Sequence, residues 1–228
     1  MPWARAVDGA VALIEAGTTL VALLPTAAAR IDRAANLAGE PRDTIHLDGV
    51  EPLFLGPAAN GVDATTLRYR GALSRVALMA GALERMSMLT QRYTRERQQF
   101  GRAVRSFQAV QQHIVVGAQE AAIVGMAASA AARAANVDDG VRAGRFEIAA
   151  AKILADQAAR TATRAAHQAH GAMGMTQEYS LHHFSRRLWS WRSEYGTERP
   201  WSRALGELIT AAGPDDLYPL VTGGSAHP

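Results

Sequence analysis

The sequence predicts a mainly α fold: an up-and-down bundle of four long helices, preceded by a partial antiparallel β segment. Short apolar runs broken by Gly and Pro fill residues 1–60, and helical periodicity without such breaks begins near Ala64. Helices of this length need neighbours in a bundle to bury their apolar faces. We therefore divide the chain into a β remnant at 1–60, a helical bundle at 61–213 and a flexible tail at 214–228, which is rich in Gly and Pro.

The β segment contains three expected strands, at residues 10–14, 19–24 and 44–47. Apolar and β-branched residues fill these runs, and turns are expected at Gly17 and Gly49. Three strands are too few for a sheet that is stable by itself. We expect the segment to be the end of a β domain whose beginning is absent, and a true start upstream of the present one would account for this.

The bundle is expected to begin with a helix from Thr65 or Thr66 to about Gln99, on the order of 50 Å long. A second helix is expected from Ser106, a residue type that often caps helix N-termini. Its apolar residues recur at alternating steps of three and four, so they form one packing stripe. The stripe consists of Phe107, Val110, Ile114, Gly117, Ala121, Val124 and Ala128.

Three further helices are expected after this stripe. Residues 136–140 break the pattern and supply caps for a third helix, which is expected to end near His170. A fourth helix is expected over 177–193. After a break at Gly196, a further helix is expected to reach about Ala212.

Composition excludes several classes of function. The chain has no cysteine, which excludes disulfides, thiolate metal sites and cysteine nucleophiles. Its net charge is +3, and its arginines are interspersed with acidic residues, so nucleic-acid binding is not expected. The histidine pairs lack the facing Glu-x-x-His units of a di-iron bundle, so no metal is expected. We read no bilayer-spanning run and no signal peptide, and we expect a cytoplasmic protein without a membrane partner.

Polar side chains gather where the first two long helices meet. Arg97 and Gln99 lie at the end of the first helix, in the run Tyr93–Gly101, and Gln108 opens the second, in the run Ser106–Gln111. Most such clusters are solvated helix ends. A planar guanidinium is also well suited to phosphate oxygens, so this cluster is a candidate binding site.

A glycine turn follows the third helix, in the run Gln168-Ala169-His170-Gly171-Ala172-Met173-Gly174. Glycine often ends helices in this way. It also allows the backbone to approach a ligand closely, so the turn is a second candidate site.

These runs resemble the R-x-Q-F-G … F-Q signature of the acyl-CoA dehydrogenase family, whose members are FAD enzymes. The resemblance implies that 1–60 ends the family's middle β domain and that 61–213 is its C-terminal bundle. It implies FAD as cofactor and acyl-CoA as substrate, with Arg and Gln side chains on the pyrophosphate and adenosine side. The cofactor-binding residues it implies are Arg97, Gln99, Phe100, Gln108, Gln168, Gly171 and Thr197. The family has glycine where this chain has Ala172, which would bring a methyl group close to the cofactor.

The same resemblance indicates that the catalytic base of the family is missing at its usual position. The family's base is the Glu of a Tyr-Glu-Gly-Thr run, and this chain has Glu194-Tyr195-Gly196-Thr197 there. The base position therefore holds Tyr195, a residue type with a pKa of about 10 and a poor base at neutral pH. Other members carry the base on the first bundle helix, where this chain has Gly71. Glu194 lies one residue earlier, and adjacent helical residues do not share a face.

Two functions follow from the resemblance. In one, the chain is a catalytic acyl-CoA dehydrogenase acting by itself, or a fragment of one, with Glu194 or a residue not yet recognised as base. In the other, it completes the FAD site of a hetero-oligomer, because FAD in the family lies across a subunit interface. A larger homologous subunit would hold the flavin ring, the acyl thioester and the base, as in two-gene members that act on steroid side chains. We favour the second function. The acyl chain, of a fatty acid or of a steroid side chain, stays open, as does the choice between a larger homologous subunit and a second copy of this chain in a dimer or tetramer.

Overall fold

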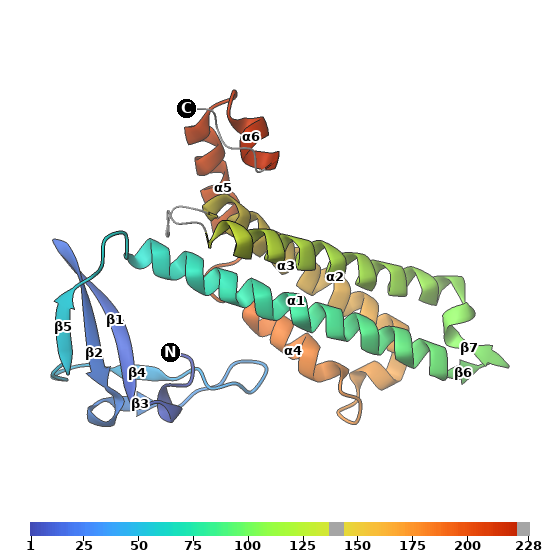
Figure 1. Cartoon of the computed structure of the whole chain (residues 1–228). Helices are drawn as coiled ribbons and strands as arrows, with labels where there is room; N and C mark the ends of the chain where they lie inside the picture. Colours follow the sequence, from blue (N-terminus) through green and yellow to red (C-terminus); the bar gives the residue numbers. More distant parts are fainter. Residues whose placement is uncertain (137–143, 223–228) are drawn as a thin grey trace. The chain divides into compact units, whose positions relative to one another are not determined.

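The computed structural model describes residues 1–136 and 144–222. The chain forms two compact units, Met1–Arg68 and Tyr69–Pro228, and each is described by itself. The three-stranded sheet and one two-stranded ladder belong to the first unit, and the long helices lie almost wholly in the second (Figure 1).

The first unit contains a three-stranded antiparallel sheet in the order β1-β2-β5. β1 (Gly9–Ala16) and β2 (Thr18–Pro25) form a hairpin around Gly17, whose φ of 79° is readily adopted by glycine. β5 (Phe54–Pro57) pairs with β2 at the edge of the sheet, where a proline without an N–H is tolerated. The two strands expected at 10–14 and 19–24 are therefore confirmed.

A separate two-stranded ladder joins β3 (Arg30–Asp32) to β4 (Thr44–His46). The sequence predicted β4 but missed both β3 and β5. These two strands are only three and four residues long, and neither has the alternation of apolar residues that identifies a strand. Two single 3-10 turns complete the unit, at Ala4–Ala6 and Thr26–Ala28.

The buried carboxylate of Asp43 joins separate segments of the first unit. It forms an ion pair with the Arg5 guanidinium and accepts hydrogen bonds from the backbone N–H groups of Arg5 and Ala34, each at 3.1 Å. The hydrogen bond from Arg5 holds the pKa of Asp43 well below its usual range. The small β unit therefore depends on an ionic contact as well as on its sheet.

Three long helices form the bundle: α1 (Ala64–Glu96), α2 (Gln108–Ala134) and α3 (Arg145–His170). Figure 1 shows the three running side by side. The fourth bundle helix, α4 (Leu181–Trp191), has 11 residues and is shorter than the helix expected over 177–193. The mainly α bundle preceded by a small antiparallel sheet is confirmed.

The alanine-rich helix α3 supplies much of the bundle core. Its buried alanines allow the neighbouring helices to approach closely. Longer apolar side chains of α1 belong to the same core, namely Val76, Met79, Leu83 and Met86. Two charged residues of α3, Lys152 and Asp156, are also fully buried, and burial of charge requires bonded partners.

The start of α2 differs from the expectation. Ser106 does not cap this helix, because its hydroxyl donates a hydrogen bond to the carbonyl of Ala103 at 2.8 Å, within the 3-10 turn Val104–Ser106. Phe107 occupies the N-cap position and makes no side-chain cap. The apolar stripe from Phe107 to Ala128 is confirmed as a packing face, since each member is partly or fully buried.

The C-terminal region contains two more helices, α5 (Glu198–Ala212) and α6 (Leu217–Thr222). The end of α5 agrees with the sequence prediction. Helix α6 lies within the segment that we expected to be a flexible tail. The rest of that tail, 223–228, and most of the expected capping run at 136–140 lie outside the described residues.

Helix α2 contradicts the expectation that no segment is long and apolar enough to cross a bilayer. It has 27 residues, and its most apolar 18-residue window has a mean hydropathy of 1.5, with 11% of that window buried within the chain. A single helix of this kind is weak evidence for a membrane span, because a soluble bundle helix also passes this test. The finding does mean that α2 exposes an apolar face.

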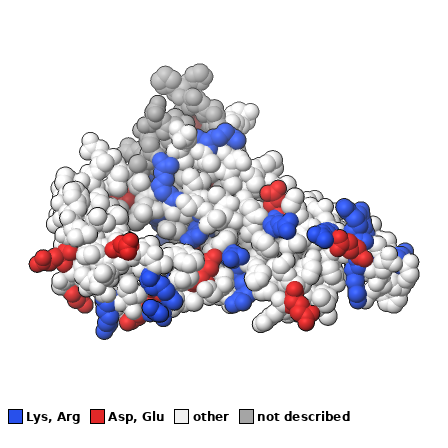
Figure 2. Space-filling view, turned by 60° about the horizontal axis from the view of Figure 1, so that its bottom comes forward, with Lys and Arg blue, Asp and Glu red and all other residues white. Residues whose placement is uncertain are grey.

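Charges of both signs are mixed over the surface. On the face of the described chain drawn in Figure 2, basic and acidic side chains are interspersed. A broad patch of one sign, of the kind that binds nucleic acid, is not present on that face.

Candidate functional site

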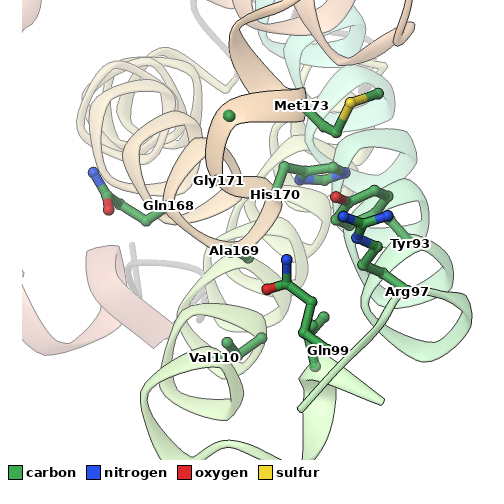
Figure 3. A pocket seen from close by; sticks show the side chains of 11 residues that line it. Tyr93, Arg97, Gln99, Val110, Gln168, Ala169, His170, Gly171 and Met173 are labelled. Atoms are coloured by element: carbon green, nitrogen blue, oxygen red, sulfur yellow. The ribbon is translucent and has the colours of Figure 1, made fainter. Parts of the chain in front are cut away.

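One end of the bundle contains a cavity of about 250 Å³. It lies where the end of α1, the start of α2 and the end of α3 come together (Figure 3). The 3-10 turn η4 (Gly171–Met175) closes α3 at this point. The lining residues are Tyr93, Arg97, Gln99, Val104, Val110, Gln168, Ala169, His170, Gly171, Ala172 and Met173.

A tight hairpin supplies one wall of the cavity. Strands β6 (Gln98–Gln99) and β7 (Arg102–Ala103) pair around Phe100 and Gly101, whose φ angles are 53° and 77°. Two successive positive φ angles are typical of the turn that joins two-residue hairpins, although Phe100 is an unusual residue there. The Phe100 side chain is 90% exposed and lies edge-on to Phe107, so it points outward and does not line the cavity.

Arg97 lies at the junction of α1 and this hairpin. Its backbone N–H donates to the carbonyl of Tyr93 at 2.8 Å, and its own carbonyl accepts from Val104 at 2.8 Å. The backbone of Arg97 is therefore fixed on both sides. Figure 3 shows its guanidinium next to Tyr93 and the amide of Gln99 on the same side of the cavity. This arrangement offers several N–H donors to an anionic or oxygen-rich group.

The opposite wall is the end of α3. Gly171 adopts φ 60° and ψ −140°, a conformation open essentially to glycine alone. Its N–H closes the helix by donating to the carbonyls of His167 and Gln168. In Figure 3 the Gln168 amide points away from Arg97, on the other side of the helix end. The predicted glycine turn is thus present at the cavity, with Ala172 also in the lining.

Three aromatic side chains support this wall, and the sequence did not identify them. The rings of Tyr93 and His170 stack at 4.5 Å, and Tyr179 packs against both. Burial lowers the pKa of His170, so its ring is neutral at pH 7 with Nδ1 bonded to the carbonyl of Ala166 at 2.7 Å. Tyr93 lies one helical turn before Arg97, and this i, i+4 spacing was the available signal.

The structure does not bring all the predicted cofactor residues together. Arg97, Gln99, Gln168 and Gly171 line the cavity, whereas Gln108 at the start of α2 does not. Phe100 also stays outside. The remaining residue, Thr197, lies in a different place altogether.

Thr197 precedes α5 and lines a separate open groove with Asp156 of α3. Asp156 and His170 are 14 positions apart on the same helix, which corresponds to roughly 21 Å. The chain therefore contains two distant candidate regions, one around Arg97 and one around Thr197. A single compact ligand pocket within one copy of the chain does not contain both.

The second region holds the residues around the expected base. Glu194 forms an ion pair with Arg75 of α1, with Oε2 and Nε 2.5 Å apart, and both side chains are mostly buried. Tyr195 has a φ of 59° and its ring covers Gly71, where a Cβ atom would lie 2.1 Å from the ring carbon Cε1. The two positions at which the resemblance predicts a base, 195 and 71, thus hold a tyrosine ring and the glycine that it covers.

A metal site is not evident. Among residues 1–136 and 144–222, no three His, Asp or Glu side chains lie close enough together to hold an ion.

Comparison with known proteins agrees with these features. A family model described as "Acyl-CoA dehydrogenase, C-terminal domain" matches residues 64–199. The chain is 31% identical over 138 residues to the probable acyl-CoA dehydrogenase YngJ of Bacillus subtilis, a match that covers 57% of this chain and 36% of that protein.

Solved structures share the fold at lower identity. The ChsE4–ChsE5 complex of Mycobacterium tuberculosis contains a chain with a TM-score of 0.76 and 22% identity, covering 93% of this chain and 58% of that one. Glutaryl-CoA dehydrogenase of Mycobacterium smegmatis has a TM-score of 0.79 and 21% identity, covering 93% and 57%. The chain thus spans little more than half the length of these relatives. Since the family model covers more than half of this chain and includes Arg97, Gln168 and Thr197, the chain belongs to the acyl-CoA dehydrogenase family.

Proposed function

We propose that this chain completes the FAD site of an acyl-CoA dehydrogenase hetero-oligomer. A larger homologous subunit would hold the flavin ring, the acyl-CoA and the base for α,β-desaturation of the thioester. One observation carries the proposal: Arg97 and the Gly171 turn, which lie in runs that resemble the family's cofactor motifs, line one cavity, while Tyr195 and Gly71 occupy the positions where a base is expected.

The residues at the cavity fit part of FAD. Arg97 and Gln99 offer N–H donors to pyrophosphate oxygens, and Gly171 allows the backbone to approach a ligand without a side chain. The stacked rings of Tyr93 and His170 provide an apolar wall. When bound, FAD supplies the acceptor for the hydride that leaves the acyl chain.

The size of the cavity supports a shared site. Its volume of about 250 Å³ is below the range of roughly 300–1,000 Å³ typical of small-ligand pockets. A whole dinucleotide is larger than a typical drug molecule, so this cavity accepts only one end of it. The remainder of the cofactor would rest on another chain, as it does when a cofactor lies across a subunit interface.

The surroundings of Glu194 argue against this residue as a base. Its carboxylate forms an ion pair with the Arg75 guanidinium, so its Oε2 is already occupied by a fixed partner. The adjacent Tyr195 ring lies over the α1 surface at Gly71. A base must be free to reach the proton that it removes. The carboxylate of Glu194 is paired with Arg75, and Tyr195 has no carboxylate.

An exposed apolar face supports a protein partner. Val115, Ile123 and Met126 of α2 and Met88 of α1 are all exposed, and an open groove of about 510 Å³ runs between these helices. Exposed apolar patches on soluble proteins often mark interfaces. Two of the structures that share the fold are described as a ChsE4–ChsE5 complex and a Tcur3481–Tcur3483 steroid acyl-CoA dehydrogenase, so paired subunits occur on this fold.

Flavin retention tests the proposal. The complex of this chain with the product of the neighbouring gene is purified with wild-type chain, Arg97→Ala or Arg95→Ala, and its FAD-to-protein ratio is measured. Arg95 is the matched control, since it is an exposed arginine of the same helix end that does not line the cavity. We expect Arg97→Ala to lose most of its FAD and Arg95→Ala to retain it. Equal FAD content in all three preparations would refute the cofactor role of the cavity.

A further inference from the structure

The turn between α4 and α5, residues 192–198, is held by a buried lysine. Lys152 is the single lysine of the chain and its side chain is fully buried. Its Nζ donates hydrogen bonds to the carbonyls of Arg192 at 2.6 Å and Gly196 at 2.9 Å. One ammonium group therefore bridges the first residue of the turn to a residue four positions later.

Asp156, one helical turn further along α3, holds the same turn. It is also fully buried and lies one helical turn after Lys152. Its Oδ1 accepts a hydrogen bond from Arg192 Nε at 2.5 Å, and its Oδ2 accepts the backbone N–H of Glu198 at 2.7 Å. The backbone groups on both sides of Thr197, the carbonyl of Gly196 and the N–H of Glu198, are thus bonded to α3.

These four bonds leave the chain between them in a strained conformation. Tyr195 has a φ of 59°, which is uncommon for a residue with a large side chain. Its carbonyl accepts the indole N–H of the fully buried Trp201 at 3.1 Å. Strain of this kind persists only where the surroundings fix it, and here Lys152 and Asp156 fix the turn on either side of Tyr195.

Charge around the turn is nearly balanced. Lys152 faces Asp156 of α3, Arg192 at the end of α4 and Glu194 of the turn, and Glu194 is paired with Arg75 of α1. Burial is the main reason why the pKa of Lys152 falls to about 8. Because burying this charge costs free energy, we expect the lysine to be retained for fixing the positions of the carbonyl groups that it bonds.

We propose that Lys152 and Asp156 are positioning residues: they hold the 192–198 turn so that the Tyr195 ring is seated on Gly71 and Thr197 is fixed at the start of α5. The inference rests on the proposed function in one respect only: positions 195 and 71 are where catalytic relatives are expected to carry their base. The ring then acts as a built-in occupant of this chain's own second site. The geometry itself is tested without flavin, acyl-CoA or partner.

The indole N–H of Trp201 reports on the turn, because it is bonded to the carbonyl of Tyr195. Hydrogen exchange of this N–H is measured by NMR on the full chain, in wild type, Lys152→Met and Asp156→Asn. Thr163→Val is the matched control, since Thr163 is another buried polar residue of α3 and its hydroxyl has no hydrogen-bond partner among the described residues. We expect at least tenfold faster exchange at Trp201 in both clamp variants and no change in the control.

A local effect distinguishes positioning from general destabilisation. In Asp156→Asn the amides at the end of α3, including the bonded N–H of Gly171, are expected to keep their wild-type protection. If Lys152→Met does not fold, Asp156→Asn alone decides. Unchanged exchange at Trp201, or equal loss of protection along the whole of α3, would overturn the proposal.

Discussion

The ring of Tyr195 lies directly on the backbone of Gly71, so that even a methyl group at position 71 would come within 2.1 Å of the ring. The two residues are 124 positions apart, on α1 and on the turn before α5. Each explains the other: glycine leaves the space that the ring fills, and the ring excludes any side chain from that space. A chain with this contact cannot carry a carboxylate at position 71 without moving the turn.

The contact predicts a strong coupling between the two positions. Gly71→Ala is expected to destabilise the chain by about 1–3 kcal/mol, because the added methyl overpacks against the ring. Gly81→Ala is the matched control on the same helix, since a Cβ there meets nothing within 4 Å. The control is expected to be neutral or to stabilise by up to about 1 kcal/mol. Urea unfolding measures both free energies.

A double variant checks the cause of that cost. In Tyr195→Ala, the same Gly71→Ala change is expected to lose most of its penalty, since the ring is gone. If the penalty is unchanged in the Tyr195→Ala background, the ring contact is not its source.

The ion pair of Glu194 and Arg75 predicts a structural rather than a catalytic role. Glu194→Gln is expected to cost about 1–3 kcal/mol of unfolding free energy, because it leaves the mostly buried Arg75 without its counter-charge. Turnover of the assembled complex is expected to stay within about threefold of wild type, whereas loss of a catalytic base costs on the order of a hundredfold or more. Arg75→Met serves as the partner variant. A hundredfold fall in kcat with Glu194→Gln alone would identify Glu194 as the base.

Buried Lys152 predicts a change of stability in alkaline solution. Its pKa is about 8 in the folded chain, against 10.5 for an ordinary lysine, so the unfolded chain binds its proton more tightly. The cost of burying this charge is therefore fully present below pH 8 and disappears as the pH rises to 10.5. The difference between the two pKa values corresponds to roughly 3 kcal/mol.

Other groups also titrate in this range, so a difference isolates Lys152. The unfolding free energy of wild type minus that of Lys152→Met is expected to increase from pH 8 to pH 10.5, as measured by urea unfolding at several pH values. A flat difference would mean that Lys152 keeps an ordinary pKa.

Asp43 predicts a response to acid in the first unit. The pKa of its carboxyl is lowered by Arg5, so its stabilising contribution is present at neutral pH and is lost as the pH falls through the lowered value. Asp43→Asn is expected to lower the stability of the β unit at pH 7. In strong acid, the difference in stability between this variant and the wild type is expected to become smaller. Asp48→Asn, at an exposed position, is the control and should follow the wild type. Circular dichroism against pH distinguishes the two variants.

Sequence patterns predicted the parts of this fold that depend on local periodicity. The apolar stripe of α2 and the glycine end of α3 at Gly171 follow from helix geometry and from the conformational freedom of glycine, and both are present. Ser106 was a wrong cap because its hydroxyl bonds backward to Ala103, a choice that residue type alone does not determine. The short strands β3 and β5 depend on partners far along the chain.

The candidate site was predictable only in part. Arg97, Gln99, Gln168 and Gly171 were expected together and line one cavity. Thr197 was expected with them but lines a separate groove beside Asp156, further toward the start of α3. The stacking of Tyr93 on His170 and the contact of Tyr195 with Gly71 depend on tertiary packing between distant segments. No single-sequence pattern encodes such contacts, since the residues involved share no periodicity.

Flavin absorbance across size exclusion tests the central claim most directly. The tagged chain is purified alone and co-expressed with the product of the neighbouring gene, and absorbance at flavin wavelengths is recorded with the protein elution. A shared FAD site predicts a colourless chain alone and a yellow complex that contains both chains. A yellow homo-oligomer formed by this chain alone would contradict the account and would direct the search for a base to Glu194.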